Sequence, residues 1–440
     1  MNVCERATTE FSNYLTEEWR ASLGCTEPAA IAHAAALAAS HCSGRIRMVR
    51  LVCDARNYKN CYSVGIPNSR GKTGILWTLA IGAHLPDATR GLRCFEGIDS
   101  AVLRDAADLL DRQGVQVEVD AASPGLLIDV MVVRESGAAR VVVAREHTRV
   151  VRIEVDGRLI KGGDDPENQS APSVRETLAR SGLADVVAMA RGINRADRAR
   201  LREGADLNLA MARHALGLLP AGFITDGETS GQSRLSLLVA AGVFGRMSGE
   251  PLTVMSLAGS GNKGITVSVP LTLHGRETGV PQERIDEALA LACLLTSATT
   301  WHLGTLSAIC GAANAGGIGI AAGLVLMKGG TLEQIGMALG TMVGNLAGMI
   351  CDGAKIGCAM KTMTGVDAAF RAASLAMLGL GVPATDGIVG EDGNASLLNL
   401  GRLAQRGMAD TDAEILAIMQ GKLKRRPPSL ADAEAAENHA

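Results

Sequence analysis

The chain changes character near residue 195, and this change constrains the fold more than any other feature. Before it, short alternating or β-branched runs are mixed with helical patterns. Beyond Ala196 such runs largely disappear, and long stretches rich in Ala, Gly, Leu and Met follow. We therefore expect an α+β protein. Its N-terminal half should be a mixed α/β unit with antiparallel strands, and its C-terminal half should consist mainly of Gly/Ala-rich helices whose small residues let backbones approach closely.

The length of 440 residues is enough for two or three domains. We predict a mixed α+β domain over residues 1–195, a helical domain over 196–425 and a disordered tail over 426–440. The basic block KLKRRPP begins at Lys422 and is followed by an acidic, Ala-rich end. A short basic block without aromatic residues is more typical of a solvated tail than of a nucleic-acid site.

Strand patterns are confined to the first half. The segment Pro28–Ala39 predicts an Ala-rich helix, and Ile46–Val52 alternates apolar residues with Arg as a strand does. Four more short strands are expected at Val115–Val119, Leu126–Val133, Arg140–Ala144 and Val150–Val155. The turn-like sequences between these runs favour an antiparallel meander.

The sequence predicts where two helices of the second half begin. Thr331 and Gln334 form a capping-box pattern before the apolar run Ile335–Met349. Pro281 can occupy the first turn of a helix that runs to Leu295.

No membrane or export segment is expected. The apolar stretch Gly316–Met327 is shorter than the roughly 20 residues that span a bilayer, so it predicts a buried helix. Residues 1–20 contain no apolar segment typical of a secretory signal, which favours a cytoplasmic protein.

Composition narrows the class of function. The 43 Lys and Arg residues against 46 Asp and Glu give a net charge of -3, so no overall basic field favours nucleic acid. With 3 Trp, 3 Tyr and 5 Phe, a base-stacking surface would be difficult to build. Ten Cys residues are too few for a disulfide-stapled scaffold of this length, so we expect reduced thiols.

Four of these cysteines lie next to Gly and short polar residues. They are Cys25 in LGCTEP, Cys310 in LSAICGAANAGG, and Cys351 and Cys358 in GMICDGAKIGCAMK. Glycine permits the close backbone approach and amide donors that thiolates around one metal centre need. The spacing is not the CxxC of zinc or ferredoxin sites, however, and on spacing alone a buried apolar thiol is the commoner alternative.

A second motif is the segment Ser256–Ile265, SLAGSGNKGI. It offers backbone amides, a hydroxyl, a carboxamide and an ammonium group for an anion, and the expected binding residues are Ser260, Gly261, Asn262, Lys263 and Gly264. A Gly-rich turn between a helix and a strand explains the pattern about as well. Lys263 could also form a Schiff base with pyridoxal phosphate, whereas the spacing of a Walker NTPase is missing.

Polar residues in ARNYKNC form a third candidate group. Asn57, Lys59 and Asn60 follow a predicted strand and could bind a small carboxylate, although a strand-end Asx turn accounts for the two Asn nearly as well. His147, in REHTRV, is a further candidate for substrate binding. A lone histidine at a hairpin is more often a structural hydrogen-bonding residue.

Together these motifs resemble the L-cysteine desulfidase family, which is related to the alpha part of iron–sulfur L-serine dehydratases. The resemblance rests on LGCTEP, NYKN, EHTRVVRIEVDG, GSGNKGI, SAICGAANAGG, GMICDGAKIGCAMK and DGIVGED, from about Cys25 to Met419. It implies that Cys310, Cys351 and Cys358 hold a [4Fe–4S] cluster in the helical domain and that Cys25 is the proton acceptor. The implied reaction is β-elimination of L-cysteine to pyruvate, ammonia and sulfide.

The chemistry of such a site is consistent with this assignment. Three thiolates on four irons leave one iron open as a Lewis acid, and the elimination then needs only a base. Relatives can end in a Cys that reaches the open iron, whereas this chain ends Glu437-Asn438-His439-Ala440. Cys25 could take that place at rest.

Several alternatives remain open at this stage. A small amino acid is the expected partner, and L-serine, L-threonine or another β-substituted amino acid could replace L-cysteine. A pyridoxal enzyme built on Lys263, or a non-catalytic iron–sulfur or redox-sensing protein, would belong to a different class. The sequence also leaves the oligomeric state open, with a homo-oligomer as one alternative.

Overall fold

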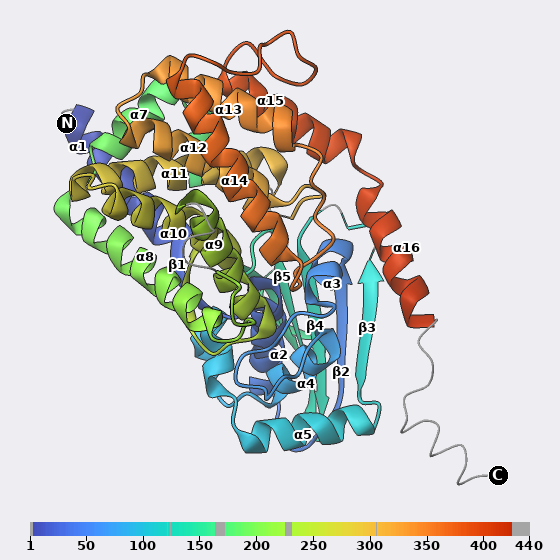
Figure 1. The fold of residues 1–440 in the computed structure, drawn as a ribbon. Helices are drawn as coiled ribbons and strands as arrows, with labels where there is room; N and C mark the ends of the chain where they lie inside the picture. The colour runs from blue at the N-terminus through green and yellow to red at the C-terminus, as the bar shows by residue number, and fades with distance from the viewer. Residues whose placement is uncertain are drawn as a thin grey trace.

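The computed structural model describes residues 3–120, 122–123, 125–162, 172–224, 231–304 and 306–424, with side chains described in these ranges from residue 10 to residue 422. The expected tail at 426–440 lies outside these residues. The described chain is α+β, as the sequence predicted: a sheet unit is followed by a larger helical unit (Figure 1).

The elements of the first half mix helices with strands. In chain order they are α1 (Val3–Glu18), β1 (Trp19–Leu23), α2 (Thr26–Ser40), β2 (Ile46–Asp54), α3 (Ala55–Cys61), α4 (Ile75–His84), the 3-10 segment η1 (Ala88–Gly97), α5 (Ser100–Asp111), β3 (Val115–Asp120), β4 (Leu127–Arg134), β5 (Gly137–Ala144), β6 (Val150–Val155), β7 (Arg158–Lys161), α6 (Val174–Arg180) and α7 (Leu183–Arg191).

The second half is helical apart from one strand. Its elements are α8 (Arg195–Leu216), α9 (Gly231–Ser248), β8 (Thr253–Leu257), α10 (Gly261–Glu277), α11 (Gln282–Leu303), α12 (Gly311–Met327), α13 (Leu332–Leu346), α14 (Cys358–Met377), α15 (Gly393–Arg402), the π-helical turn η2 (Leu403–Gly407) and α16 (Thr411–Lys424). None of the helices in the described ranges is both long enough and apolar enough to cross a lipid bilayer.

Every strand that the sequence predicted is present, but one of them pairs differently from a simple meander. The six-stranded sheet has the order β3-β2-β4-β5-β6-β7. Strands β4 to β6 follow one another as antiparallel neighbours, as expected, and β7, which the sequence did not predict, pairs antiparallel with β6. Strand β3 instead lies at the edge, parallel to β2, with Val49 opposite Val115. The helices between β2 and β3 provide the long connection that parallel pairing requires.

Close helix packing in the second half depends on glycine. Helix α12 contacts α10, α11, α13 and α14 and is buried along most of its length. A Cβ added to Gly319 would lie 2.4 Å from the Ala292 carbonyl oxygen, and one added to Gly365 would lie 2.7 Å from that of Ala313. The Gly/Ala-rich composition therefore sets how closely these helices approach.

The predicted helix starts are found where the sequence placed them. Thr331 and Gln334 form a capping box at the start of α13. Helix α11 begins directly after Pro281, which is its N-cap, and continues beyond Leu295 to Leu303. The apolar stretch Gly316–Met327 is the buried body of α12.

A two-stranded sheet that the sequence did not predict joins the two halves. Strand β1 pairs antiparallel with β8, with Trp19 opposite Leu257. The chain that leaves β1 reaches Cys25, and the chain that leaves β8 forms the turn before α10. This pairing therefore places the Cys25 segment beside the Ser256–Ile265 segment.

The buried residues form two hydrophobic cores. One core lies around the six-stranded sheet and takes its residues from between Leu23 and Ile153. The other lies among the C-terminal helices and also includes buried residues of α1, such as Phe11 and Leu15. The chain thus contributes its N-terminal helix to the helical core, and the division near residue 195 stays a prediction.

Candidate active site

A cavity of about 100 Å³ lies where the two halves meet, and most of the predicted site residues line it. Its walls come from α2, α3, the β5–β6 turn, α9, the β8–α10 turn and the cysteine-bearing segments. The predicted residues that line it are Cys25, Lys59, Asn60, His147, Ser260, Asn262, Lys263, Cys310, Cys351 and Cys358. Segments more than 300 residues apart in sequence therefore contribute to one site.

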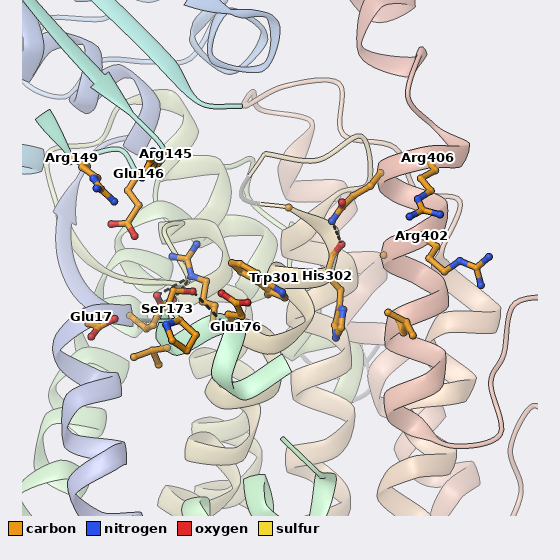
Figure 2. A pocket seen from close by; sticks show the side chains of 18 residues that line it. Glu17, Arg145, Glu146, Arg149, Ser173, Glu176, Trp301, His302, Arg402 and Arg406 are labelled. Atoms are coloured by element: carbon orange, nitrogen blue, oxygen red, sulfur yellow. Dashed lines mark hydrogen bonds and ion pairs between the residues drawn. The ribbon is translucent and has the colours of Figure 1, made fainter. Parts of the chain in front are cut away.

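A larger hollow of about 990 Å³ adjoins this cavity and shares Gly304 with it. Figure 2 shows Trp301 and His302 between Glu176 on one side and Arg402 on the other. Its wall contains both arginines and glutamates, and no cysteine is among the described residues that line it. Of these two hollows, the smaller one is therefore lined by the predicted cysteines.

Cys25 is the N-cap residue of α2, with Pro28 in the first turn of that helix. Its side chain is buried, and its Sγ donates to Oε2 of Glu27 at 3.2 Å. Burial, and then the Glu27 carboxylate, raises the pKa of Cys25 well above its ordinary value, while Arg246 acts in the opposite direction. The helix N-terminus alone therefore does not make this group a thiolate, and its proton faces Glu27.

Glu27 is held in turn by Asn60. The Asn60 Nδ2 donates to Glu27 Oε1 at 2.8 Å, and the backbone N–H of Ala354 donates to Asn60 Oδ1 at 3.1 Å. These contacts link Cys25 to the segment between Cys351 and Cys358. Glu27 is not among the residues predicted from the sequence, although its place two residues after Cys25 in LGCTEP was a usable signal.

The three cysteines expected to hold a cluster come from neighbouring turns. Cys310 caps the N-terminus of α12, Cys358 opens α14, and Cys351 lies in the loop before α14. The backbone N–H of Cys310 donates to Met349 O at 2.9 Å, and that of Cys351 donates to Ala308 O at 2.7 Å. These two bonds place the Cys310 and Cys351 segments side by side.

The donor type of these three residues is the one that iron–sulfur clusters use, since such clusters are held by Cys thiolates. Within the described ranges, no three His, Cys, Asp or Glu side chains form a group that could hold a single metal ion. Sulfur donors at two helix N-termini, near the ammonium of Lys361, suit a negatively charged cluster.

Two of the three thiols, those of Cys310 and Cys358, have raised pKa values. Burial, and then Cys351 and Cys358, raises the pKa of Cys310 to about 12. Burial likewise raises the pKa of Cys358 to about 11. Thiols of this kind stay protonated at neutral pH until a metal displaces their protons.

Lys59 contacts the cysteine loop directly. Its buried Nζ donates to the Cys351 carbonyl oxygen at 2.6 Å and to Asp412 Oδ1 at 2.5 Å. Arg56 also donates to Asp412, at 2.7 Å from Nε to Oδ2. The Lys59 ammonium is thus engaged with protein groups and connects α16 to the Cys351 loop. Arg56 and Asp412 were not predicted, because their partners lie more than 300 residues away.

Asn57 does not line the cavity. It is fully buried, and its Nδ2 donates to Asp54 Oδ2 at 2.6 Å, at the start of α3. His147 does line the cavity, and its buried Nε2 has no hydrogen-bond partner in the described part of the chain. Burial lowers the pKa of His147, which favours the neutral imidazole.

The Ser260–Gly264 segment is a strand-to-helix turn that contributes three residues to the cavity wall. Ser260 is the N-cap of α10, and Asn262 and Lys263 lie in its first turn. The Lys263 Nζ donates to the Ala258 carbonyl oxygen at 3.1 Å. Burial, and then Arg175, lowers the pKa of Lys263 to about 7.

The two predicted glycines of this turn serve packing and do not line the cavity. A Cβ added to Gly264 would lie 1.8 Å from the Met255 carbonyl oxygen. One added to Gly261 would lie 2.3 Å from Nε of Arg246. Arg246 itself lines the cavity and was not predicted, because it sits in an apolar helix with no local motif around it.

Known proteins resemble this chain along nearly its whole length. Residues 128–417 match the family described as serine dehydratase alpha chain. A UPF0597 protein of Geobacter sulfurreducens is 33% identical over 92% of this chain and 97% of its own length. A UPF0597 protein of Nitratidesulfovibrio vulgaris is 35% identical over 93% of this chain and 98% of its own length.

A third relative, from Caldanaerobacter subterraneus, is also named a UPF0597 protein and is 32% identical over 91% of this chain and 96% of its own length. The matched family range contains Cys310, Cys351 and Cys358, and the relatives extend the similarity over most of the remaining chain. The coarser form of the predicted resemblance is confirmed, and it indicates a role like that of an amino-acid ammonia-lyase. The chain therefore belongs to the serine dehydratase alpha chain family.

Proposed function

We propose that the cavity catalyses β-elimination on a small amino acid, with L-cysteine as the preferred substrate and pyruvate, ammonia and sulfide as products. The observation that carries this proposal is the meeting of two groups on one cavity wall. One is the hydrogen-bonded pair Cys25 and Glu27, and the other is the set of three cysteines. Family membership supports an amino-acid lyase, and the name of the family points to serine as the competing substrate.

The proposal assigns Cys310, Cys351 and Cys358 to an iron–sulfur cluster. When bound, a cluster with three thiolate ligands supplies an open iron that acts as a Lewis acid. The described residues provide the remaining functions. Lys59 fixes the Cys351 carbonyl, and Asn60 fixes the Ala354 amide, so the loop between the cysteines is anchored on both sides.

The base is the pair formed by Cys25 and Glu27. The Glu27 carboxylate accepts the thiol proton along the existing Sγ to Oε2 contact, and the Cys25 sulfur then removes the α-proton of the substrate. The electron pair left at the α-carbon forms the double bond to the β-carbon, and the β-carbon–sulfur bond breaks to release hydrogen sulfide ion. The aminoacrylate then hydrolyses to pyruvate and ammonia.

The size of the cavity favours a small substrate. A volume of about 100 Å³ is well below the roughly 300–1,000 Å³ of pockets for drug-sized ligands. Burial of Cys25, Asn60 and Lys263 keeps the reacting groups out of bulk water. L-Serine and L-threonine are of similar size, so the identity of the leaving group decides between substrates.

Anaerobic reconstitution with iron and sulfide provides the test. We expect bound iron, acid-labile sulfide and a broad visible absorption, and we expect L-cysteine to yield pyruvate and sulfide in equal amounts. Faster turnover of L-serine or L-threonine would replace the substrate assignment and keep the reaction type. A pyridoxal chromophore in iron-free, active protein would overturn the proposal, as would a loaded cluster without turnover of any of the three amino acids.

A further inference from the structure

Arg246 is a buried cation in the wall of the cavity. It lies on α9, is 2% exposed and lines the cavity together with Cys25. The two basic residues Arg56 and Lys59 share Asp412, whereas no carboxylate within the described residues forms an ion pair with Arg246. Burying a guanidinium group without an opposite charge costs free energy. We therefore expect an anionic ligand to bind beside Arg246.

The hydrogen bonds of Arg246 fix the orientation of its guanidinium but use only some of its N–H donors. Its Nη1 donates to Asn262 Oδ1 at 2.9 Å, and its Nη2 donates to the Gly24 carbonyl oxygen at 2.7 Å. Its Nε is buried and has no hydrogen-bond partner among the residues that the structure describes. Each Nη atom carries two N–H groups, so these two bonds leave one N–H on Nη1 and one on Nη2 for a ligand.

The protein's own acid in the cavity is already engaged. Among the described residues that line it, Glu27 is the one carboxylate, and its two oxygens accept from Cys25 and Asn60. Lys263 is a second lysine or arginine of the wall that forms no ion pair with a carboxylate of the described residues, and its Nζ donates to the Ala258 carbonyl oxygen. A planar guanidinium matches a carboxylate better than an ammonium does, because two parallel N–H groups can bind both oxygens.

We propose that Arg246 binds the α-carboxylate of the amino-acid substrate and so selects amino acids over amines that lack this group. This inference rests on the proposed function, because it takes the cavity as the substrate site. The Nη2 of Arg246 already contacts Gly24, the residue before Cys25. A carboxylate held at this guanidinium brings the adjacent α-carbon beside the Cys25 thiol, where its proton is removed.

Glycine at position 261 is part of this arrangement. A Cβ there would lie 2.3 Å from Arg246 Nε and 2.8 Å from a methyl carbon of Val254, so no larger residue fits between them. The absence of a side chain lets the guanidinium pack directly against the start of α10 and reach Asn262. The Gly-rich turn thus positions the arginine.

Equilibrium binding of two probes to reconstituted protein tests the proposal. The first probe, 3-mercaptopropionate, has a thiol and a carboxylate, and the second, cysteamine, has a thiol and an amine. Changes in the visible absorption of the cluster report binding without turnover. We expect Arg246→Met to lower the affinity for 3-mercaptopropionate by about ten- to a hundredfold, which is the effect of losing a charged hydrogen bond. The affinity for cysteamine should stay within about threefold of the wild-type value.

Two further variants keep the result interpretable. Arg246→Lys retains the charge and should recover part of the affinity for 3-mercaptopropionate. Arg198→Met removes a partly buried arginine of α8 that pairs with Glu287 away from the cavity, and it should change neither affinity.

Four outcomes would overturn the assignment. Equal weakening of both probes in Arg246→Met would mean that the arginine acts on a feature they share. Unchanged binding of both would place the carboxylate elsewhere. Loss of iron in both Arg246 variants would assign the guanidinium to the cluster. If wild-type protein binds neither probe, the proposed function itself fails, and this inference fails with it.

Discussion

The Sγ of Cys25 lies 3.2 Å from Oε2 of Glu27, two residues further along the chain at the start of α2. The carboxylate has two effects on this thiol. Together with burial it raises the pKa of Cys25, and it also provides an acceptor for the thiol proton. Asn60 fixes the second carboxylate oxygen and is itself fixed by the Ala354 amide. A thiol, a carboxylate and an orienting carboxamide are thus arranged in one hydrogen-bonded chain.

The variant Glu27→Gln tests whether the carboxylate accepts the proton. A positioned base contributes about 10²–10⁴-fold, so kcat/KM for L-cysteine should fall by about a hundredfold or more while iron content is retained. The control Glu283→Gln changes an exposed acid in the first turn of α11 and should have wild-type kinetics. A rise in activity would mean that Glu27 merely disfavours the thiolate, since its removal would then lower the pKa of Cys25.

The variant Cys25→Ser tests whether Cys25 is the base or a ligand of the cluster. We expect it to keep iron and visible absorption, but to lose elimination and the exchange of the substrate α-proton with solvent. The control Cys94→Ser alters a buried thiol beside the Ala29 carbonyl, away from the cavity, and should stay active. An iron-free Cys25→Ser protein would make Cys25 a ligand and leave Lys59, His147 and Lys263 as candidate bases.

The sequence predicts the helical half well because local signals suffice there. Each of these signals lies within a few residues of the helix that it predicts. They are the glycine and alanine content, the capping box at Thr331 and the proline before α11. The β1–β8 pair is different, because each strand has only five residues and its partner lies more than 200 residues away. Nothing local distinguishes such segments from loops.

The residues of the candidate site could be predicted where they occur in distinctive motifs. Cys25 and the three cysteines stand in glycine-rich or polar contexts, and the cavity brings them together. Arg246 is embedded in an apolar helix, and Asp412 lies near the end of the described chain, so neither has a neighbour in sequence that signals its role. Their significance comes from contacts between distant segments.

Alanine substitutions test the cluster assignment. Each of Cys310→Ala, Cys351→Ala and Cys358→Ala removes one of the three thiolates, so iron per chain and broad visible absorption should be lost. The control Cys293→Ala changes a fully buried thiol of α11 that does not line the cavity, and it should retain iron. Full iron content in any two of the three variants would contradict the assignment.

The variant Asp412→Asn tests the link between α16 and the cysteine loop. It leaves the buried Lys59 ammonium without its counter-charge, and breaking a buried pair costs about 3–5 kcal/mol of unfolding free energy. Because Lys59 also holds the Cys351 carbonyl, iron should be released faster to a chelator. Asp410→Asn changes an exposed acid just before α16 and serves as the control. Unchanged stability together with unchanged iron release would show that this contact does not support the loop.

The buried ammonium of Lys263 predicts a dependence of stability on pH. Burial, and then Arg175, lowers its pKa to about 7 in the folded protein, whereas the unfolded chain keeps this amine protonated to about pH 10. Between about pH 7 and 9 the unfolded chain holds more protons at this site, so the free energy of unfolding rises with pH.

Lys263→Met should remove a slope of up to about 1.4 kcal/mol per pH unit, measured by denaturant unfolding of reduced apoprotein. Lys328→Met, at an exposed position, should keep the wild-type slope. Equal slopes in wild type and Lys263→Met would show that Lys263 stays charged when buried, which would make it a rival to Arg246 for the substrate carboxylate.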